Sequence, residues 1–347
     1  MQDKITNSSD ELLNCPSLNG TIIGGPQTKD RDERIDSLKF GLIVLVVAVH
    51  VIMRGEFVDS TACIVLWNGI NIFAMPLFVF ISGYFSRKND IERFWPNIWK
   101  LLEPLIIFQI IGLIFYDNKP LSIWTILTPW YVLWYLLSLI YWRFILQIIP
   151  DKILRHKKLI IICTFCISIL AGFLPFDRVL SIQRTLSFMP FFFLGYCMRG
   201  KNIYLPNKYK PICIVLLALI FVILCFFPYR LNSLFNDIPY KSINEAAIRV
   251  ICFALSFPMS IAFINICCNT PWIARQGRFS LHYYIYHALL IQPFMIVAGK
   301  LNIPMTFLSA VFIIIGITLF ISFALNIPLV RKMTNPSSFL KKRINNL

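Results

Sequence analysis

The sequence predicts an all-α integral membrane protein that crosses the bilayer about ten times, with both the N and C termini in the cytoplasm. Of its 347 residues, 57% are hydrophobic and only 14% are charged. The apolar residues gather in stretches long enough for a helix to cross a hydrocarbon layer about 30 Å thick, where every backbone N–H and C=O group needs an internal partner. Such a composition excludes a soluble globular domain.

The predicted membrane helices follow the apolar stretches in order. They are expected near residues 36–54, 61–85, 98–116, 125–149, 158–174, 181–198, 210–228, 246–268, 279–298 and 304–330. Together they form a predicted membrane domain over residues 34–330. The polar residues 1–33 are predicted to be a disordered cytoplasmic tail without the apolar core of a signal peptide, and residues 331–347 to be a basic cytoplasmic tail.

The net charge of +16 comes from short basic runs between the apolar stretches. Because most of these runs fall on the side assigned to the cytoplasm, they indicate a multi-pass protein of the inner (plasma) membrane in contact with lipid, and no nucleic-acid partner is expected. The predicted outer loops mix acidic and basic residues, which suits a polar substrate. Cys163 and Cys166 lie in an apolar stretch without a second ligand pair, so no metal site is expected.

The first predicted helix carries three ionisable residues, Asp36, Lys39 and His50. Lys39 and His50 are separated by about three helical turns, so they lie on one face of the helix but roughly 16 Å apart along its axis. Lys39 is then expected near the cytoplasmic surface and His50 deep in the outer half, which suits a long ligand with its charged end inside and neutral imidazole as a general base. Alternatively, Lys39 only anchors the helix at the headgroups and His50 only caps its outer end.

Other polar residues within the predicted helices have both a structural and a functional interpretation. Glu103 and Arg249 are costly to insert into a bilayer unless they neutralise each other or find other partners. Ser82 and Gly83 allow close helix packing or place a hydroxyl near a tunnel. His287 is expected to line the same cavity as His50.

Five segments carry a resemblance to a known family. The first is Asp36-Ser-Leu-Lys39 followed by His50, and the others are MPLFVFISGYFSRK (75–88), PWYVLWYLLSLIYW (129–142), FMPFFFLGYCMRG (188–200) and GRFSLHYYIYH (277–287). In this order they resemble the membrane-bound acyltransferase family 3, over about residues 34–298. A lysine stands at position 39 where the family more often has arginine. Within the family the sequence is most similar to the fucose 4-O-acetylase type.

The resemblance implies acyl transfer from a cytoplasmic acyl-CoA, usually acetyl-CoA, to a hydroxyl of a carbohydrate or lipid-linked glycan, with no permanently bound cofactor. It makes His50 the base that activates the hydroxyl or the group that receives the acyl chain. It implies Lys39 for the phosphates or pantetheine of CoA. Arg87, Lys88 and Arg93, in the predicted cytoplasmic loop after the second helix, either bind the anionic nucleotide of CoA or only supply the positive charge typical of cytoplasmic loops. The residues expected in the substrate cavity or at its mouth are Asp36, Ser82, Trp134, Tyr135 and His287, with Asp36 paired to Lys39 or another basic residue.

A different class of function remains compatible with these spans, a non-enzymatic exporter or flippase of a polysaccharide or lipid-linked sugar. Many transporters of this kind carry paired broken helices in two repeated halves, and the sequence has no clear internal repeat. The sequence leaves open the acyl group, the sugar and its hydroxyl, and the oligomeric state.

Overall fold

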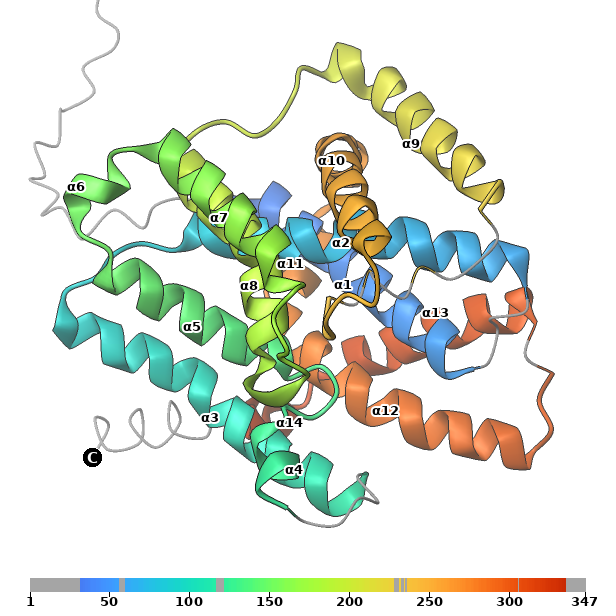
Figure 1. The fold of residues 1–347 in the computed structure, drawn as a ribbon. Helices are drawn as coiled ribbons and strands as arrows, with labels where there is room; N and C mark the ends of the chain where they lie inside the picture. Colours follow the sequence, from blue (N-terminus) through green and yellow to red (C-terminus); the bar gives the residue numbers. More distant parts are fainter. Residues whose placement is uncertain are drawn as a thin grey trace, which may run out of the picture. The chain divides into compact units, whose positions relative to one another are not determined.

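The computed structural model describes residues 32–55, 60–116, 122–227, 231, 234, 236–304 and 306–334. The regular elements of these residues are all helices, which confirms the predicted all-α fold (Figure 1). The predicted tails, 1–33 and 331–347, lie almost wholly outside the described residues.

The first helices along the chain are α1 (Glu33–Arg54), α2 (Thr61–Phe85), α3 (Ile91–Phe115), α4 (Ile123–Leu127), α5 (Trp134–Ile148), α6 (Asp151–Leu154) and α7 (Lys157–Ala171). They are followed by α8 (Ile182–Met198), α9 (Lys210–Cys225), α10 (Ile243–Ile266), α11 (Pro271–Gly277), α12 (Ser280–Lys300), α13 (Phe307–Ala324) and α14 (Pro328–Met333). Short 3-10 turns, Val179–Ser181 and Asn207–Tyr209, precede α8 and α9.

Among the described residues, 7 helices are long and apolar enough to cross a membrane, namely α1, α2, α3, α9 with its preceding turn, α10, α12 and α13. The shorter helices α5, α7 and α8 occupy further predicted apolar stretches. These helices support a polytopic membrane protein, as predicted. The total number of crossings and the side on which the termini lie stay predictions.

Two predicted helices are interrupted in the structure. The stretch 125–149 is not one helix but α4 and α5, separated by the irregular segment 128–133. Pro129 explains the break, because proline disfavours helical backbone in the residue before it, and Thr128 is extended (φ −88°, ψ 115°). Pro328 ends the helical run in 304–330 in the same way after an extended Ile327, which separates α14 from α13.

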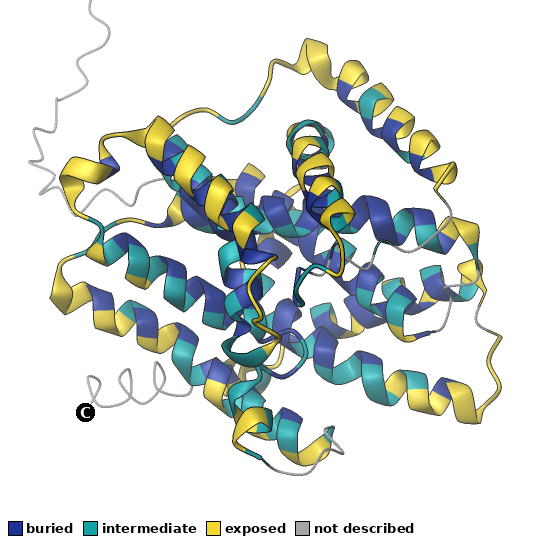
Figure 2. Ribbon diagram, in the orientation of Figure 1, coloured by how far each residue is buried: buried dark blue, intermediate teal, exposed yellow. Residues whose placement is uncertain are grey.

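Burial divides the helices into inner and outer members (Figure 2). In the most apolar 18-residue window, 72% of α1 and 67% of α2 is buried, against 22% of α9. The outer face of α9 exposes large apolar side chains such as Ile212, Val215 and Leu219. A helix that is apolar on its outer face as well belongs against lipid tails, so α1 and α2 form the interior and α9 faces the bilayer.

Three glycines bring two pairs of helices, α2 with α8 and α11 with α1, into backbone contact. A Cβ atom on Gly83 of α2 would lie 1.9 Å from the carbonyl oxygen of Phe192 in α8, and one on Gly195 of α8 would lie 2.0 Å from that of Phe80 in α2. Gly277 at the end of α11 meets α1 in the same way, 1.7 Å from the carbonyl oxygen of Asp36. The close packing that the sequence predicted at Gly83 is therefore present, and it fixes α8 against α2.

Arg249 of α10 is buried. It does not pair with Glu103, one of the partners that the sequence suggested for it. Its guanidinium donates to the Ser168 carbonyl at 3.0 Å and to the Ser187 hydroxyl at 3.1 Å, and it lies 4.4 Å from the centre of the Tyr240 ring. Among the ion pairs of the described residues, none joins it to Glu103. Arg249 thus links α10 to α7 and α8.

Candidate active site

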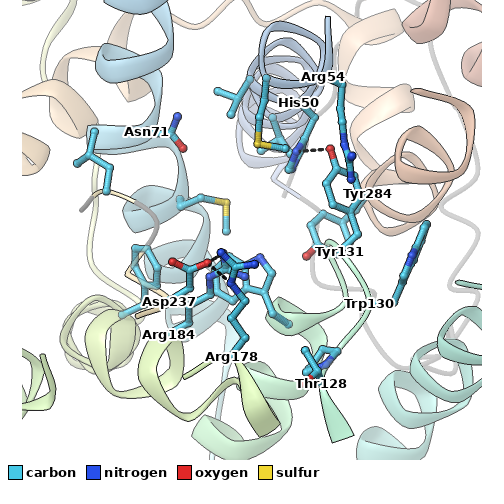
Figure 3. A pocket seen from close by; sticks show the side chains of 18 of the residues that line it. His50, Arg54, Asn71, Thr128, Trp130, Tyr131, Arg178, Arg184, Asp237 and Tyr284 are labelled. Atoms are coloured by element: carbon cyan, nitrogen blue, oxygen red, sulfur yellow. Dashed lines mark hydrogen bonds and ion pairs between the residues drawn. The ribbon is translucent and has the colours of Figure 1, made fainter. Parts of the chain in front are cut away.

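A cavity of about 660 Å³ lies beside the end of α1 that carries His50. We call it the His50 cavity. Figure 3 shows side chains from α1, α8, α12 and the irregular segment 128–133 around it. The lining residues used below are His50, Arg54, Tyr116, Trp124, Trp130, Tyr131, Trp134, Asp177, Arg178, Arg184, Asp237 and Tyr284.

His50 is held by a hydrogen bond on one edge of its ring and by aromatic packing. Its Nδ1 lies 2.8 Å from the Tyr131 hydroxyl. The ring of His287 lies 5.2 Å from the ring of His50, centre to centre, so the two predicted histidines are neighbours. His287 is fully buried behind the cavity wall, with its Nδ1 bonded to the Tyr283 carbonyl at 2.9 Å. With Nδ1 of His50 engaged by Tyr131, Nε2 is the nitrogen left to act on a substrate.

The irregular segment 128–133 positions Tyr131 and would leave backbone groups without partners if nothing contacted it. Gln109 of α3 closes this gap, because its Nε2 donates to the Thr128 carbonyl at 2.9 Å and its Oε1 accepts from the Trp130 N–H at 2.7 Å. The Tyr284 hydroxyl donates to the Val132 carbonyl. Irregular backbone within a membrane protein is tolerated where protein groups satisfy it beside a cavity, as here.

Backbone strain is concentrated around the same cavity. Tyr131 has a φ of 46°, in the left-handed region that is unfavourable for a bulky side chain. Leu180 and Asn236, which adjoin the lining residues Val179 and Asp237 in the chain, have φ values of 52° and 51°, and Ser181, which follows Leu180, has a φ of 55°. Such conformations cluster at binding and catalytic sites, where the surrounding structure holds them in place.

Basic side chains of α8 and of the segment before it form one wall of the cavity (Figure 3). The same oxygen of Asp237 accepts from Arg178 at 2.9 Å and from Arg184 at 3.0 Å. The Arg184 guanidinium also lies over the Trp134 ring at 4.9 Å, and that of Arg54 over the Tyr131 ring at 4.8 Å. Aromatic faces attract cations and fix the plane of an arginine.

A second, smaller cavity of about 170 Å³ lies beside Lys39, and we call it the Lys39 cavity. Ser82 and Tyr135, both predicted for the substrate cavity, line it together with apolar residues of α3 and α5. The predicted pairing of Asp36 with Lys39 is present, with 3.3 Å between Oδ1 and Nζ. Asp36 is buried, and its other oxygen lies 4.0 Å from Nε of Arg278.

Tyr284 lines both the His50 cavity and the Lys39 cavity. Its ring lies 5.4 Å from the ring of Tyr135 and 6.4 Å from that of Phe78. The Tyr135 hydroxyl forms a short hydrogen bond with Ser82. We call Phe78, Tyr135 and Tyr284 the aromatic barrier, since Tyr284 lines both cavities and the rings of Phe78 and Tyr135, which line the Lys39 cavity, pack against it.

The predicted site residues thus separate into three groups. Trp134 lines the His50 cavity, whereas Ser82 and Tyr135 line the Lys39 cavity. The three basic residues after α2 line neither: Arg87 bonds to Asn89 at 3.1 Å, Lys88 pairs with Asp151 at 3.0 Å, and the Arg93 side chain is exposed. Their predicted role toward CoA therefore requires a part of the ligand that extends outside the Lys39 cavity.

Several lining residues were not among the sequence-predicted site residues, above all Tyr131, Arg184 and Tyr284. Tyr131 lies three residues before Trp134 in a segment whose sequence looks like an uninterrupted helix, and only Pro129 signals the break. Arg184 had a clearer signal, because an arginine at the start of an apolar helix is costly to insert unless it faces a polar cavity.

A family model described as an acyltransferase domain, that of acyltransferase family 3, matches residues 32–327. The matched range contains both cavities and every segment of the predicted resemblance. No curated protein and no solved structure matches the chain. The match is to the family as a whole, so the likeness to fucose 4-O-acetylases stays a prediction. The chain, a helical protein with apolar helices of membrane-spanning length, belongs to the acyltransferase family 3 and is a membrane acyltransferase.

Proposed function

We propose that the protein transfers an acyl group, in the first instance acetyl, from cytoplasmic acyl-CoA to a hydroxyl of a surface polysaccharide or lipid-linked glycan. In this proposal the protein lies in the plasma membrane with Lys39 toward the cytoplasm. The donor enters from the Lys39 side, the acceptor occupies the His50 cavity, and His50 is the general base.

The observation that carries the proposal is the pair of cavities on one helix face, separated by the aromatic barrier. The Lys39 cavity is small and mostly apolar, with Lys39 as the cation among its lining residues, which suits a pantetheine arm that leads back to phosphates. The His50 cavity is larger and lined by aromatic and polar groups, which suits a sugar. A thioester that reaches past Tyr284 would meet a hydroxyl beside His50.

The proposed chemistry needs little beyond this arrangement. Nε2 of His50 takes the proton of the acceptor hydroxyl as its oxygen attacks the thioester carbonyl, while Nδ1–H donates to the Tyr131 oxygen. The C–S bond then breaks, the sugar ester forms, and the proton passes from His50 to the departing CoA thiolate. Exclusion of water by the buried surroundings would limit hydrolysis of the thioester.

The test is to incubate the purified protein with acetyl-CoA and glycan extracted from its own cells. We expect release of free CoA and appearance of a base-labile acetyl ester on the glycan, measured by thiol titration and mass spectrometry. A protein that neither binds nor consumes any acyl-CoA, yet moves a lipid-linked sugar across vesicles, would contradict the proposal in favour of an exporter.

Replacing Tyr131 by phenylalanine should lower kcat about 5- to 10-fold, the effect of one lost hydrogen bond. The hydroxyl 2.8 Å from His50 Nδ1 would be gone, so the imidazole would lose its orientation. The KM for acyl-CoA should not change, because the Lys39 cavity does not include Tyr131. Steady-state kinetics on both substrates measures this split.

A suitable control for this prediction is Tyr286→Phe. The Tyr286 hydroxyl donates to the Val330 carbonyl at 2.6 Å, and the residue lines neither cavity. This variant loses a similar hydrogen bond and should retain the wild-type kcat. Equal kcat values for Tyr131→Phe and wild type would show that Tyr131 does not orient the base.

A further inference from the structure

The His50 cavity has an excess of positive charge on its wall. Three arginines line it, Arg54, Arg178 and Arg184, and the acidic lining residues are Asp177 and Asp237. Arg178 and Arg184 donate to one and the same carboxylate oxygen. Among the described lining residues three arginines stand against two aspartates, which gives the cavity wall a formal excess of positive charge.

The arginines are also held in fixed orientations by aromatic rings of one segment, residues 130–134. Arg184 stacks on Trp134 and Arg54 stacks on Tyr131, with guanidinium-to-ring distances of 4.9 Å and 4.8 Å. The Arg184 side chain is 16% exposed, against 60% for Arg178. A guanidinium with a fixed plane and little water around it is well suited to bind a carboxylate or phosphate through its N–H edge.

The same cavity offers surfaces for a sugar ring. Trp124, Trp130, Trp134 and Tyr116 line it, and aromatic faces pack against the apolar faces of pyranose rings. Aromatic walls beside stacked arginines are complementary to a sugar with a negative group and leave a neutral sugar without the charged contact. Such a wall selects partners by charge as well as by shape.

We propose that Arg184, with Arg54, forms an anion subsite that makes the acceptor of this enzyme an acidic glycan. The negative group is a carboxylate of the sugar itself or a phosphate that links the glycan to its lipid. This inference rests on the proposed function, since it assigns the His50 cavity to the acceptor. Arg184 here positions the acceptor and takes no part in the bonds that form and break.

The test uses glycan extracted from the protein's own cells in three forms: untreated, carboxyl-reduced and dephosphorylated. Each is offered with acetyl-CoA to wild type, Arg184→Gln, Arg184→Lys and Arg54→Gln. For wild type we expect kcat/KM to fall about 10-fold or more on one of the two neutralised glycans, the size of a hydrogen bond between charged groups. Which glycan loses activity distinguishes a sugar carboxylate from a carrier phosphate.

In Arg184→Gln the preference for the untreated glycan should fall to about one, whereas Arg184→Lys should keep part of it, because the charge remains but the planar N–H edge is lost. Arg54→Gln leaves the two arginine pairs with Asp237 intact and should reduce the same preference, so the test does not depend on one variant that fails to fold. Arg155→Gln, at an exposed position between α6 and α7, is the charge-matched control and should behave as wild type.

Equal rates of wild type on all three glycans would overturn the anion subsite and leave O-acyl transfer intact. The same holds if Arg184→Gln and Arg54→Gln both keep the wild-type preference for charge. A wild type that consumes no acyl-CoA with any glycan would contradict the proposed function itself, and with it the acceptor assignment. The two failures are therefore distinguished by acyl-CoA consumption.

Discussion

Replacing His50 by alanine is expected to reduce acyl transfer by about 10²- to 10⁴-fold, the contribution of a positioned general base. His50 lines the His50 cavity, its Nδ1 is bonded to the Tyr131 hydroxyl, and its ring packs beside the buried ring of His287. Acyl-CoA binding should persist, because Lys39 and the small cavity beside it lie about three helical turns away on α1. Single-turnover transfer and equilibrium binding of acyl-CoA, measured on the same preparation, separate these two effects.

The control for this prediction is His282→Ala. His282 belongs to α12 and lines neither cavity, and its Nε2 lies 3.4 Å from the Arg331 carbonyl. It should transfer acyl groups at the wild-type rate. If His50→Ala does so as well, the assignment of the base is wrong, and the resemblance of the first helix to the family motif does not identify the reacting group.

The second large effect, a loss of stability, is expected when a glycine at the contact between α2 and α8 is replaced by alanine, which adds a single methyl group. Gly83→Ala or Gly195→Ala should destabilise the protein by about 3 kcal/mol or more, at the upper end of the cost of overpacking. The added Cβ would lie 1.9 Å or 2.0 Å from a backbone carbonyl oxygen of the other helix, and backbone cannot rotate away as a side chain can. The two helices would have to separate, and Ser82 and Phe188 would leave their cavities.

Gly299→Ala and Gly316→Ala are matched controls, since a Cβ at either position meets nothing within 4 Å. Both lie in helices, where alanine is favoured over glycine by about 1 kcal/mol, so they should melt at the wild-type temperature or slightly above it. Thermal unfolding in detergent compares the four variants. If Gly83→Ala unfolds at the same temperature as Gly316→Ala, α2 and α8 are less closely packed than described.

The sequence was sufficient for the all-α fold and for the placement of Lys39 and His50 along α1, although it missed the breaks before Pro129 and Pro328. Helix geometry predicts that these two side chains share a face about three turns apart, and the structure has them lining separate cavities beside α1. The partner of Lys39 was also predictable, because Asp36 lies one turn before it. Periodicity within one helix carries this information without any knowledge of the other helices.

What could not be predicted depends on contacts between distant segments. Tyr131 reaches His50 only because Gln109 of α3 and Tyr284 of α12 hold the broken segment 128–133, and no local pattern links these residues. Asp237, whose carboxylate binds both Arg178 and Arg184, lies more than fifty positions after them in the chain. For Arg249 the sequence suggested Glu103 as a partner, whereas serine groups of α7 and α8 bind it.

The aromatic barrier has a consequence for the energetics of the cell. An open aqueous path between the two faces of the membrane would conduct protons and dissipate the electrochemical gradient. The packed rings of Tyr135 and Tyr284 would hinder such a path, while in the proposed reaction an acyl group passes them in one direction and one proton returns to the CoA thiolate in the other. In this proposal the phosphates of CoA remain on the side from which they came and no net charge crosses, so the membrane potential, worth about 2.3 kcal/mol per charge at 100 mV, would neither oppose nor drive the transfer.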